Sequence, residues 1–329
     1  MFVAGRGAPL WIDAARGYLS GLRDRRLRLT GIRVFYYHGV VERRKDPLLE
    51  RNFNLASEFQ SHLRFLRKLR VLSLTELADE LSNNRVTHGA VITFDDGYAN
   101  NLIAAEIANA ARLPWSLFIS TGGVGSENAL WPEELALLLL HGHAARVEAL
   151  GSVWSMENRD ERVVGFRSIQ RAMKAMPSTI RHHTLDSIRR QFPKGETERL
   201  LHEFPSFQML SWEQTRQLAT SGVEVASHGV DHEIHHINQE PDKRWHELTE
   251  SKSELEKRLN RPCAFFAFPN GDFTSTSAEE VQQAGYTLGF TTETNTVMLG
   301  ANPYLLPRFY PAGPLQQFAC DFFWDSPVT

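Results

Sequence analysis

Residues 90–97 read AVITFDDG, an apolar run that ends directly in Asp95, Asp96 and a glycine. Such a run, bounded by turn residues, is typical of a buried strand in a parallel sheet. Two further apolar runs are followed by polar side chains in the same way: 223–226 by His228 and His232, and 264–268 by Asn270. Because the parallel strands of a barrel end at one mouth, we expect these side chains to converge there.

Short β-rich runs alternate with longer helical patterns on either side of this stretch. The predicted strands cover 33–40, 90–94, 115–120, 223–226, 264–268 and 286–292. This alternation indicates an α/β fold with a mainly parallel sheet, and six or seven such units favour a barrel. Between about 126 and 209 the chain is helical and charged without a clear strand, so we predict a helical insertion there.

Composition excludes several classes of protein. The 329 residues are 42% hydrophobic, which is enough for a large core and too much for a disordered chain. A net charge of −3 argues against a nucleic-acid partner, which would require a basic surface. Two cysteines exclude a disulfide scaffold and a Cys₄ metal site. No run of about 18 apolar residues predicts a transmembrane helix, and the start lacks a secretory signal, so we expect a cytoplasmic protein.

The N-terminus differs from the rest in charge. Residues 1–45 carry ten Arg and Lys against three acids, with apolar residues near helical spacing. We predict a basic helical segment at 1–30, followed by the barrel at 31–329. The helix either packs on the barrel by one face or lies on an anionic membrane surface as a peripheral contact.

The residues at the strand ends suit metal chemistry. An aspartate and two histidines form a three-ligand set for Zn²⁺ or a similar divalent ion and leave one position open. Because neighbouring carboxylates repel, Asp95 and Asp96 need separate partners, and the one that is not a ligand is free to act as a base. His228 and His232 reach one cation if the segment turns helically. His232 and His236 have the same spacing, so spacing does not choose between these pairs.

Three motifs carry a resemblance to a known family. TFDDGY at 93–98, His228-x₃-His232 and FAFPNGDF at 266–273 resemble the first three motifs of the polysaccharide deacetylases, carbohydrate esterase family four. That family includes the chitooligosaccharide and peptidoglycan deacetylases, and the likeness covers roughly 31–125 and 205–310. It implies a distorted (β/α)₇ barrel and a metal-dependent hydrolase that removes acetyl groups from a glycan by cleaving non-peptide carbon–nitrogen bonds.

The resemblance also implies roles for individual residues. Asp95 would be the catalytic base, and Asp96, His228 and His232 would hold a divalent metal, Zn²⁺ in our expectation. A backbone N–H near Asn270 would stabilise the oxyanion together with the metal.

Two departures from the family pattern create further candidates. Where the third motif often has an arginine that orients the base, this chain has Ala267, and Arg308 could supply the guanidinium from another strand end. The family's late histidine, which protonates the leaving amine, has no match, because no histidine follows His246. His38, at the end of the first strand, is the candidate acid; its alternative is a hydrogen-bonded histidine at the barrel rim. Tyr98 is a candidate aromatic contact for the sugar.

Three functions follow from these patterns. The first is deacetylation of an N-acetylated polysaccharide, oligosaccharide or lipid-linked glycan. The second is hydrolysis of a non-sugar amide on the same barrel, because a fold does not fix a substrate. The third is a catalytically impaired barrel that binds a glycan without turnover.

Overall fold

The computed structural model describes residues 30–311, 313–315 and 318–319. The basic segment predicted at 1–30 therefore lies outside the described residues, apart from Thr30. No helix among the described residues combines the length and apolar character needed to cross a bilayer.

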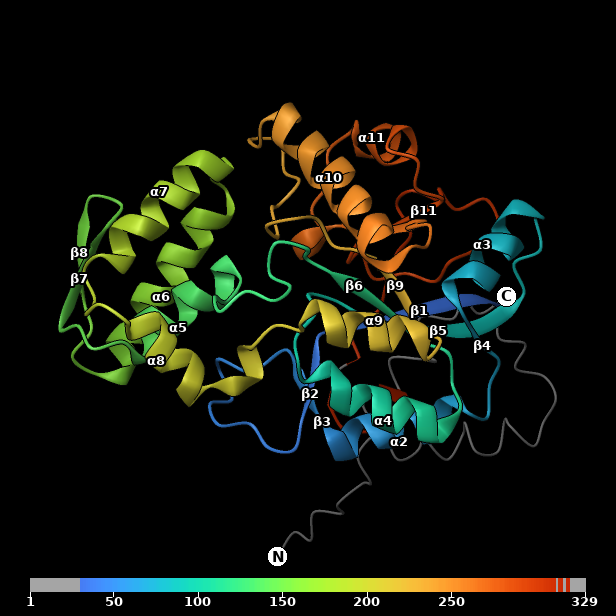
Figure 1. Ribbon diagram of the computed structural model, residues 1–329, viewed down its shortest axis with the longest axis horizontal. Coiled ribbons are helices and arrows are strands. Elements are labelled where there is room, and N and C mark those ends of the chain that lie inside the picture. Colours follow the sequence, from blue (N-terminus) through green and yellow to red (C-terminus); the bar gives the residue numbers. More distant parts are fainter. Residues whose placement is uncertain (1–29, 312, 316–317, 320–329) are drawn as a thin grey trace, which may run out of the picture.

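A curled parallel sheet forms the centre of the molecule (Figure 1). Its strands follow the order β1-β5-β6-β9-β10-β11, and the short strand β4 (Val71–Leu72) also pairs with β5. Their bounds are β1 Gly31–Tyr37, β5 His88–Phe94, β6 Ser116–Ile119, β9 Glu224–Ser227, β10 Phe265–Ala267 and β11 Leu288–Phe290. A separate parallel pair joins β2 (Gly39–Val41) to β3 (Phe53–Leu55).

The segment after β11 closes the sheet into a ring. Leu306 forms a parallel bridge with Phe290 of β11, and Phe309 forms one with Phe35 of β1. The Phe309 N–H donates to Val34 O at 2.7 Å, and the Tyr36 N–H donates to Phe309 O at 3.1 Å. Because isolated bridges take the place of a full strand here, the ring is irregular. The predicted distorted (β/α)₇ barrel is confirmed.

Alternate residues of each strand face opposite sides of the sheet, as the pleat requires. Val34, Val91 and Phe118 belong to the cluster that fills the barrel interior. Their neighbours Phe35 and Ile92 belong to a larger cluster under the surrounding helices. Both faces of these strands are thus buried, which explains their continuously apolar sequences.

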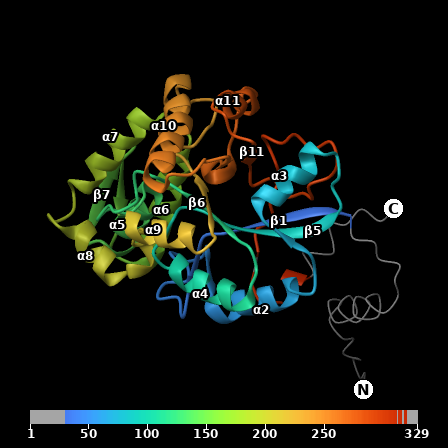
Figure 2. The ribbon, with the colours of Figure 1, turned by 45° about the vertical axis from the view of Figure 1, so that its right-hand side comes forward.

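Helices cover the outside of the barrel, with α2 and α4 below the sheet and α10 and α11 above it in Figures 1 and 2. Ser73 and Ser211 begin α3 and α9 with capping boxes, in which each hydroxyl accepts from a backbone N–H three residues on. The bounds are α2 Ala56–Leu66, α3 Leu74–Ser82, α4 Asn101–Ala111, α9 Trp212–Thr220, α10 Pro241–Leu259 and α11 Ser277–Gln283.

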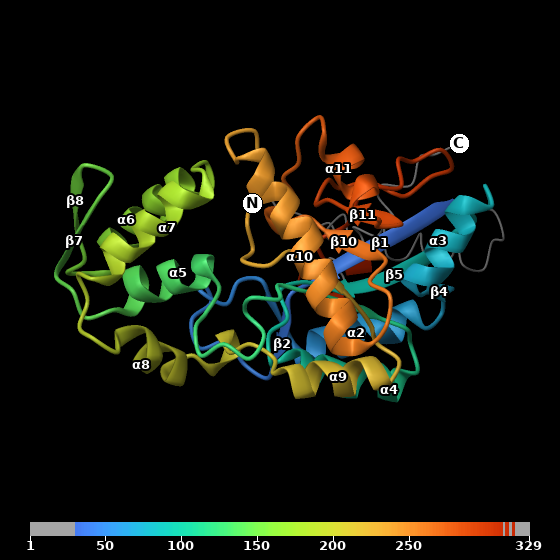
Figure 3. The same cartoon turned by 45° about the horizontal axis from the view of Figure 1, so that its top comes forward.

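A lobe with its own apolar cluster lies between β6 and α9, to one side of the barrel in Figure 3. It contains α5 (Trp131–His141), α6 (Arg159–Lys174), α7 (Ser178–Arg189), α8 (Glu196–Glu203) and the 3₁₀ turn η1 (Pro205–Phe207). The expectation of no strand here was wrong, because β7 (Arg146–Ala149) and β8 (Ser152–Ser155) pair as an antiparallel hairpin. Its turn residues, Leu150 and Gly151, both have positive φ, which is unusual for leucine and gave no turn signal.

A buried histidine below the barrel predicts a pH dependence of stability. Tyr37 donates its hydroxyl to His62 Nδ1 at 3.2 Å, His62 Nε2 donates to Gly313 O at 3.0 Å, and the Phe318 ring stacks on the imidazole. Burial lowers the pKa of His62 to about 4. Below about pH 6.5 His62 is therefore protonated in the unfolded chain but stays neutral in the folded protein. Stability consequently falls as the pH drops from about 6.5 to 4.

We expect His62→Gln to remove this pH dependence. The free energy of unfolding of the wild type, minus that of the variant, should therefore be about 2 kcal/mol lower at pH 5 than at pH 7. Urea denaturation at both pH values measures it. The exposed His183, changed to Gln, is the matched control. An equal pH dependence in wild type and His62→Gln would contradict the assignment.

Candidate metal and catalytic site

The polar residues singled out in the sequence lie at the carboxyl ends of the barrel strands. Asp95 and Asp96 follow β5 directly, and His228 follows β9. His38 follows β1, Asn270 lies in the 3₁₀ turn η2 (Pro269–Gly271) after β10, and Arg308 lies in the segment that closes the ring. This is the end of a βα barrel at which active sites are built.

Asp96, His228 and His232 meet at one point. Asp96 Oδ1 lies 3.4 Å from His228 Nε2 and 3.3 Å from His232 Nε2. One potential ligand atom from each residue lies within 4.8 Å of the other two, and among the described residues no other such group was found. Of the two equally spaced pairs, His228 and His232 are thus the pair that lies beside Asp96.

The two histidines converge without the expected helical turn. Residues 228–232 are irregular, and two positive φ angles, +81° at Gly229 and +54° at His232, turn the chain instead. A side chain at Gly229 would be strained by this φ, and its Cβ would lie 2.6 Å from Glu247 Oε2, so glycine is strongly favoured. Asp96 likewise has a positive φ of 75°, a conformation that aspartate tolerates better than most residues.

These residues fit a divalent cation. Asp96 Oδ1 is buried and has no hydrogen-bond partner, although a buried carboxylate oxygen is costly to leave unpaired. His228 Nδ1 lies 2.8 Å from Ala267 O, so Nδ1 carries the proton and Nε2 keeps its lone pair for a ligand. Burial opposes ionisation of Asp96, but the two histidines hold the pKa of its carboxyl well below the usual value.

Asp95 faces a different partner from its neighbour. Arg308 Nη1 and Nη2 each donate to one Asp95 oxygen at 2.8 Å, a bidentate pair that is wholly buried. Arg308 Nε also donates to Thr291 O at 2.9 Å, which holds the guanidinium in place. Burial alone would raise the pKa of Asp95, but Arg308 and then His228 lower it, so Asp95 is ionised at neutral pH.

His38 lies in the field of both aspartates. Burial lowers the pKa of its imidazole, while Asp96 and Asp95 partly oppose that effect. Its Nδ1 is buried and has no hydrogen-bond partner. His38 is therefore a histidine of the site that lies outside the ligand group, and no hydrogen bond from Nδ1 fixes its ring.

Tyr98 is placed differently from the aromatic contact that we expected. Its ring is only 2% exposed and lies edge-on to Phe53 and Phe207, so no sugar can stack on it. The hydroxyl instead lies against the carboxylates of Asp96 and Glu133. Burial, then Asp96, raise the pKa of Glu133 to about 7.

Glu133 of α5 was missed in the sequence. The run Pro132-Glu133-Glu134-Leu135 does not show which glutamate faces the barrel, and no motif marks either one. Trp131, which begins this helix, donates its indole N–H to His232 O at 3.0 Å. The start of α5 therefore touches the loop that carries a ligand histidine.

Asn270 is exposed and has a positive φ of 60°. Its side-chain oxygen accepts a hydrogen bond from Lys174 of α6, so the lobe also reaches the loop of the third motif. His236 contacts Met176 O at 3.2 Å. His235 is fully buried against Phe266 and Phe268.

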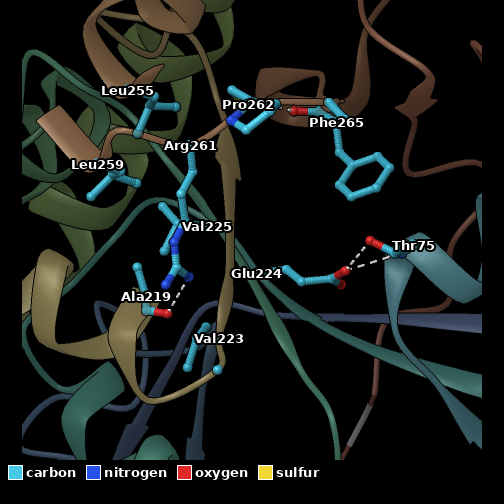
Figure 4. A pocket seen from close by; sticks show the side chains of 13 residues that line it. Thr75, Ala219, Val223, Glu224, Val225, Leu255, Leu259, Arg261, Pro262 and Phe265 are labelled. Carbon is cyan, nitrogen blue, oxygen red and sulfur yellow. Dashed lines mark hydrogen bonds between the residues drawn. The ribbon is translucent and has the colours of Figure 1, made fainter. Parts of the chain in front are cut away.

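A cavity of about 370 Å³ lies at the opposite end of the barrel, at the starts of β9 and β10 (Figure 4). Its one carboxylate, Glu224, already accepts hydrogen bonds from Thr75 and Ser116 and from the Leu74 N–H. A carboxylate with this many donors has a structural explanation, so the cavity does not compete with the site at the strand carboxyl ends.

A family model described as polysaccharide deacetylase matches residues 82–289, which is more than half of the chain. The chain belongs to the polysaccharide deacetylase family. YxkH of Bacillus subtilis (strain 168), whose name assigns it to these deacetylases, is 25% identical over 100 residues. That match spans 30% of this chain and only 35% of YxkH.

Solved deacetylases share the fold. PplD of Streptococcus pyogenes, solved with acetate, superposes with a TM-score of 0.58 at 17% identity over 89% of this chain and 99% of PplD. IcaB of Ammonifex degensii gives 0.57 at 17% identity over 90% and 97%. A de-N-acetylase of Aggregatibacter actinomycetemcomitans gives 0.52 at 15% identity over 89% and 99%. At these identities the likeness shows the barrel and leaves the substrate open.

The buried pair between Arg308 and Asp95 predicts a large effect on stability. We expect Arg308→Met to lower the free energy of unfolding by about 3–5 kcal/mol, because it leaves a carboxylate buried without its counter-charge. Adding Asp95→Asn to this variant should restore part of the loss, since it removes that charge. Urea denaturation of the two single variants and the double variant measures the coupling. Strict additivity of the two changes would show that the pair does not act as a unit.

Proposed function

We propose that this deacetylase-family protein hydrolyses the acetamide group of an N-acetylated sugar in a polysaccharide, an oligosaccharide or a lipid-linked glycan. One observation carries the proposal: two adjacent aspartates have separate partners. Asp96 faces two histidines as part of a ligand set, and Asp95 is ionised beside Arg308 without being part of that set. Binding a glycan without turnover would not require a ligand set and a spare base together.

Asp96, His228 and His232 would hold a divalent cation, for which Zn²⁺ is the best match to one carboxylate and two imidazoles. Such an ion, when bound, acts as a Lewis acid toward a carbonyl oxygen and makes water more acidic. Hydrolysis joins the water oxygen to the acetyl carbon and breaks the carbon–nitrogen bond, which gives acetate and a free amine. All remaining proton movements fall to side chains of the chain itself.

Asp95 would accept the proton of the attacking water, a role that is supported by its ionisation and by its orientation by Arg308. His38 would donate a proton to the leaving nitrogen, as the candidate acid that lies in the field of both aspartates. The Asn270 backbone N–H would face the developing oxyanion, a role that fits its place in the turn after β10. The rival hypothesis is that the substrate is a non-sugar amide. Acetate release from N-acetylated oligosaccharides, compared with hydrolysis of small amides, distinguishes the two.

Substitution of the two aspartates separates their proposed roles. We expect Asp95→Asn to reduce acetate release from an N-acetylated oligosaccharide about 10²–10⁴-fold without reducing bound metal. Asp96→Asn should reduce metal affinity, because it removes a ligand. Elemental analysis and an acetate assay on Zn²⁺-reconstituted protein measure both quantities. Equal metal loss in the two variants would contradict the division of roles.

The leaving group tests His38 as an acid. We expect His38→Gln to lower kcat on the acetamide substrate about 10²–10⁴-fold, as removal of a general acid does. The loss on 4-nitrophenyl acetate should be much smaller, because a nitrophenolate leaves without needing a proton. A loss below about tenfold on the acetamide would exclude an acid role.

A further inference from the structure

The lobe between β6 and α9 contributes a side chain to the site that the proposed mechanism leaves without a role. Glu133 lies in the first turn of α5, two residues after Trp131, whose indole N–H donates to His232 O at 3.0 Å. Its carboxylate lies in the field of Asp96 and His232 and beside the Tyr98 hydroxyl. The start of α5 thus points into the mouth of the barrel.

Glu133 differs from the glutamate that follows it. Glu134 is saturated: Arg189 Nε and Nη2 donate to its two oxygens at 2.6 and 2.8 Å, and the Thr197 hydroxyl donates at 3.1 Å. Glu133 Oε2, in contrast, is buried and has no hydrogen-bond partner. A carboxylate that only stabilised α5 would have donors like those of Glu134, because an unpaired buried oxygen costs folding free energy.

Glu133 is also not a member of the metal ligand set. The ligand atoms that lie within 4.8 Å of one another come from Asp96, His228 and His232. Among the ion pairs of the described residues, none joins Glu133 to either histidine. The unpaired oxygen therefore lies next to the ligand set without belonging to it.

Lys174 of α6 is a second charged side chain of the lobe close to the site. Its ammonium donates to Asn270 Oδ1 in the loop after β10, and it lies in the field of Glu133 and Asp272. Lys174 thus has an acceptor in the protein, whereas Glu133 Oε2 has no donor. The lobe thus offers a hydrogen-bond acceptor without a donor, and the ligand group that complements it is a donor such as a sugar hydroxyl.

We propose that Glu133 is a substrate-binding residue whose carboxylate accepts hydrogen bonds from ring hydroxyls of the sugar that carries the acetamide. This rests on the proposed function and names the part of the substrate that the lobe recognises. A site with a buried acceptor discriminates strongly against an analogue that lacks the matching hydroxyl, because the acceptor then stays unpaired. The lobe would therefore set the choice of sugar, and the barrel would supply the reaction.

The test compares Glu133→Gln with wild type on two substrates, both with Zn²⁺-reconstituted protein. An N-acetylated chitooligosaccharide has the ring hydroxyls, and 4-nitrophenyl acetate has none. The ratio of kcat/KM on the saccharide to kcat/KM on the aryl ester should fall about 10–100-fold in the variant. Glu127→Gln is the control, because Glu127 is an exposed glutamate in the loop before α5.

Deoxy substrates sharpen the comparison. Wild type should prefer the full N-acetyl sugar over one of its 3-, 4- or 6-deoxy analogues by about 10–100-fold, and Glu133→Gln should lose that preference. An unchanged preference, or an equal fall on saccharide and aryl ester, would overturn the proposal. A fall in bound metal in the variant would also overturn it, because Glu133 would then act through the cation.

A wild-type protein that cleaves the aryl ester but releases no acetate from saccharides would refute the proposed function itself. That outcome is distinct from a saccharide deacetylase in which Glu133→Gln has no effect, which refutes only the role of Glu133. Circular dichroism and thermal unfolding of each variant establish that it is folded before the kinetic comparison is made.

Discussion

The separation of two adjacent carboxylates is the constraint on which the site depends. Asp95 and Asp96 are both buried, and two carboxylates so close together would otherwise raise each other's pKa. Arg308 neutralises one of them, and His228 and His232 face the other. Two carboxylates can therefore have two different roles within a single strand end.

That separation requires the barrel to close. Arg308 lies in the segment that bridges β11 and β1 through Leu306 and Phe309, so it reaches Asp95 only when the ring is complete. In exchange, the ion pair fixes the last segment against β5 across the barrel mouth. The contact that orients Asp95 therefore depends on closure of the sheet, since Arg308 comes from the closing segment.

The sequence predicted the parts of the site that depend on strand ends. The barrel order brings together whatever follows β5, β9 and β10, so the convergence of Asp96, His228 and His232 could be inferred before the structure was known. Arg308 could be inferred because Ala267 occupies the position where the family motif often has an arginine, so a guanidinium had to come from another strand end. The direction of Tyr98 could not, because the turn after Asp96 decides whether the ring points to the mouth or under the lobe. The hairpin of β7 and β8 was missed because its turn is Leu150-Gly151.

Glu133 shows why a lobe can contribute chemistry that motifs do not reveal. The helix α5 is apolar on nearly every side, so periodicity does not distinguish an inward from an outward glutamate. The distinction arises from partners far along the chain: Arg189 of α7 pairs with Glu134, and the His232 carbonyl holds Trp131. These contacts rotate α5 so that Glu133, and not Glu134, faces the barrel. The proposed substrate specificity of Glu133 therefore depends on the packing between lobe and barrel. That packing can change while the strand-end motifs stay the same.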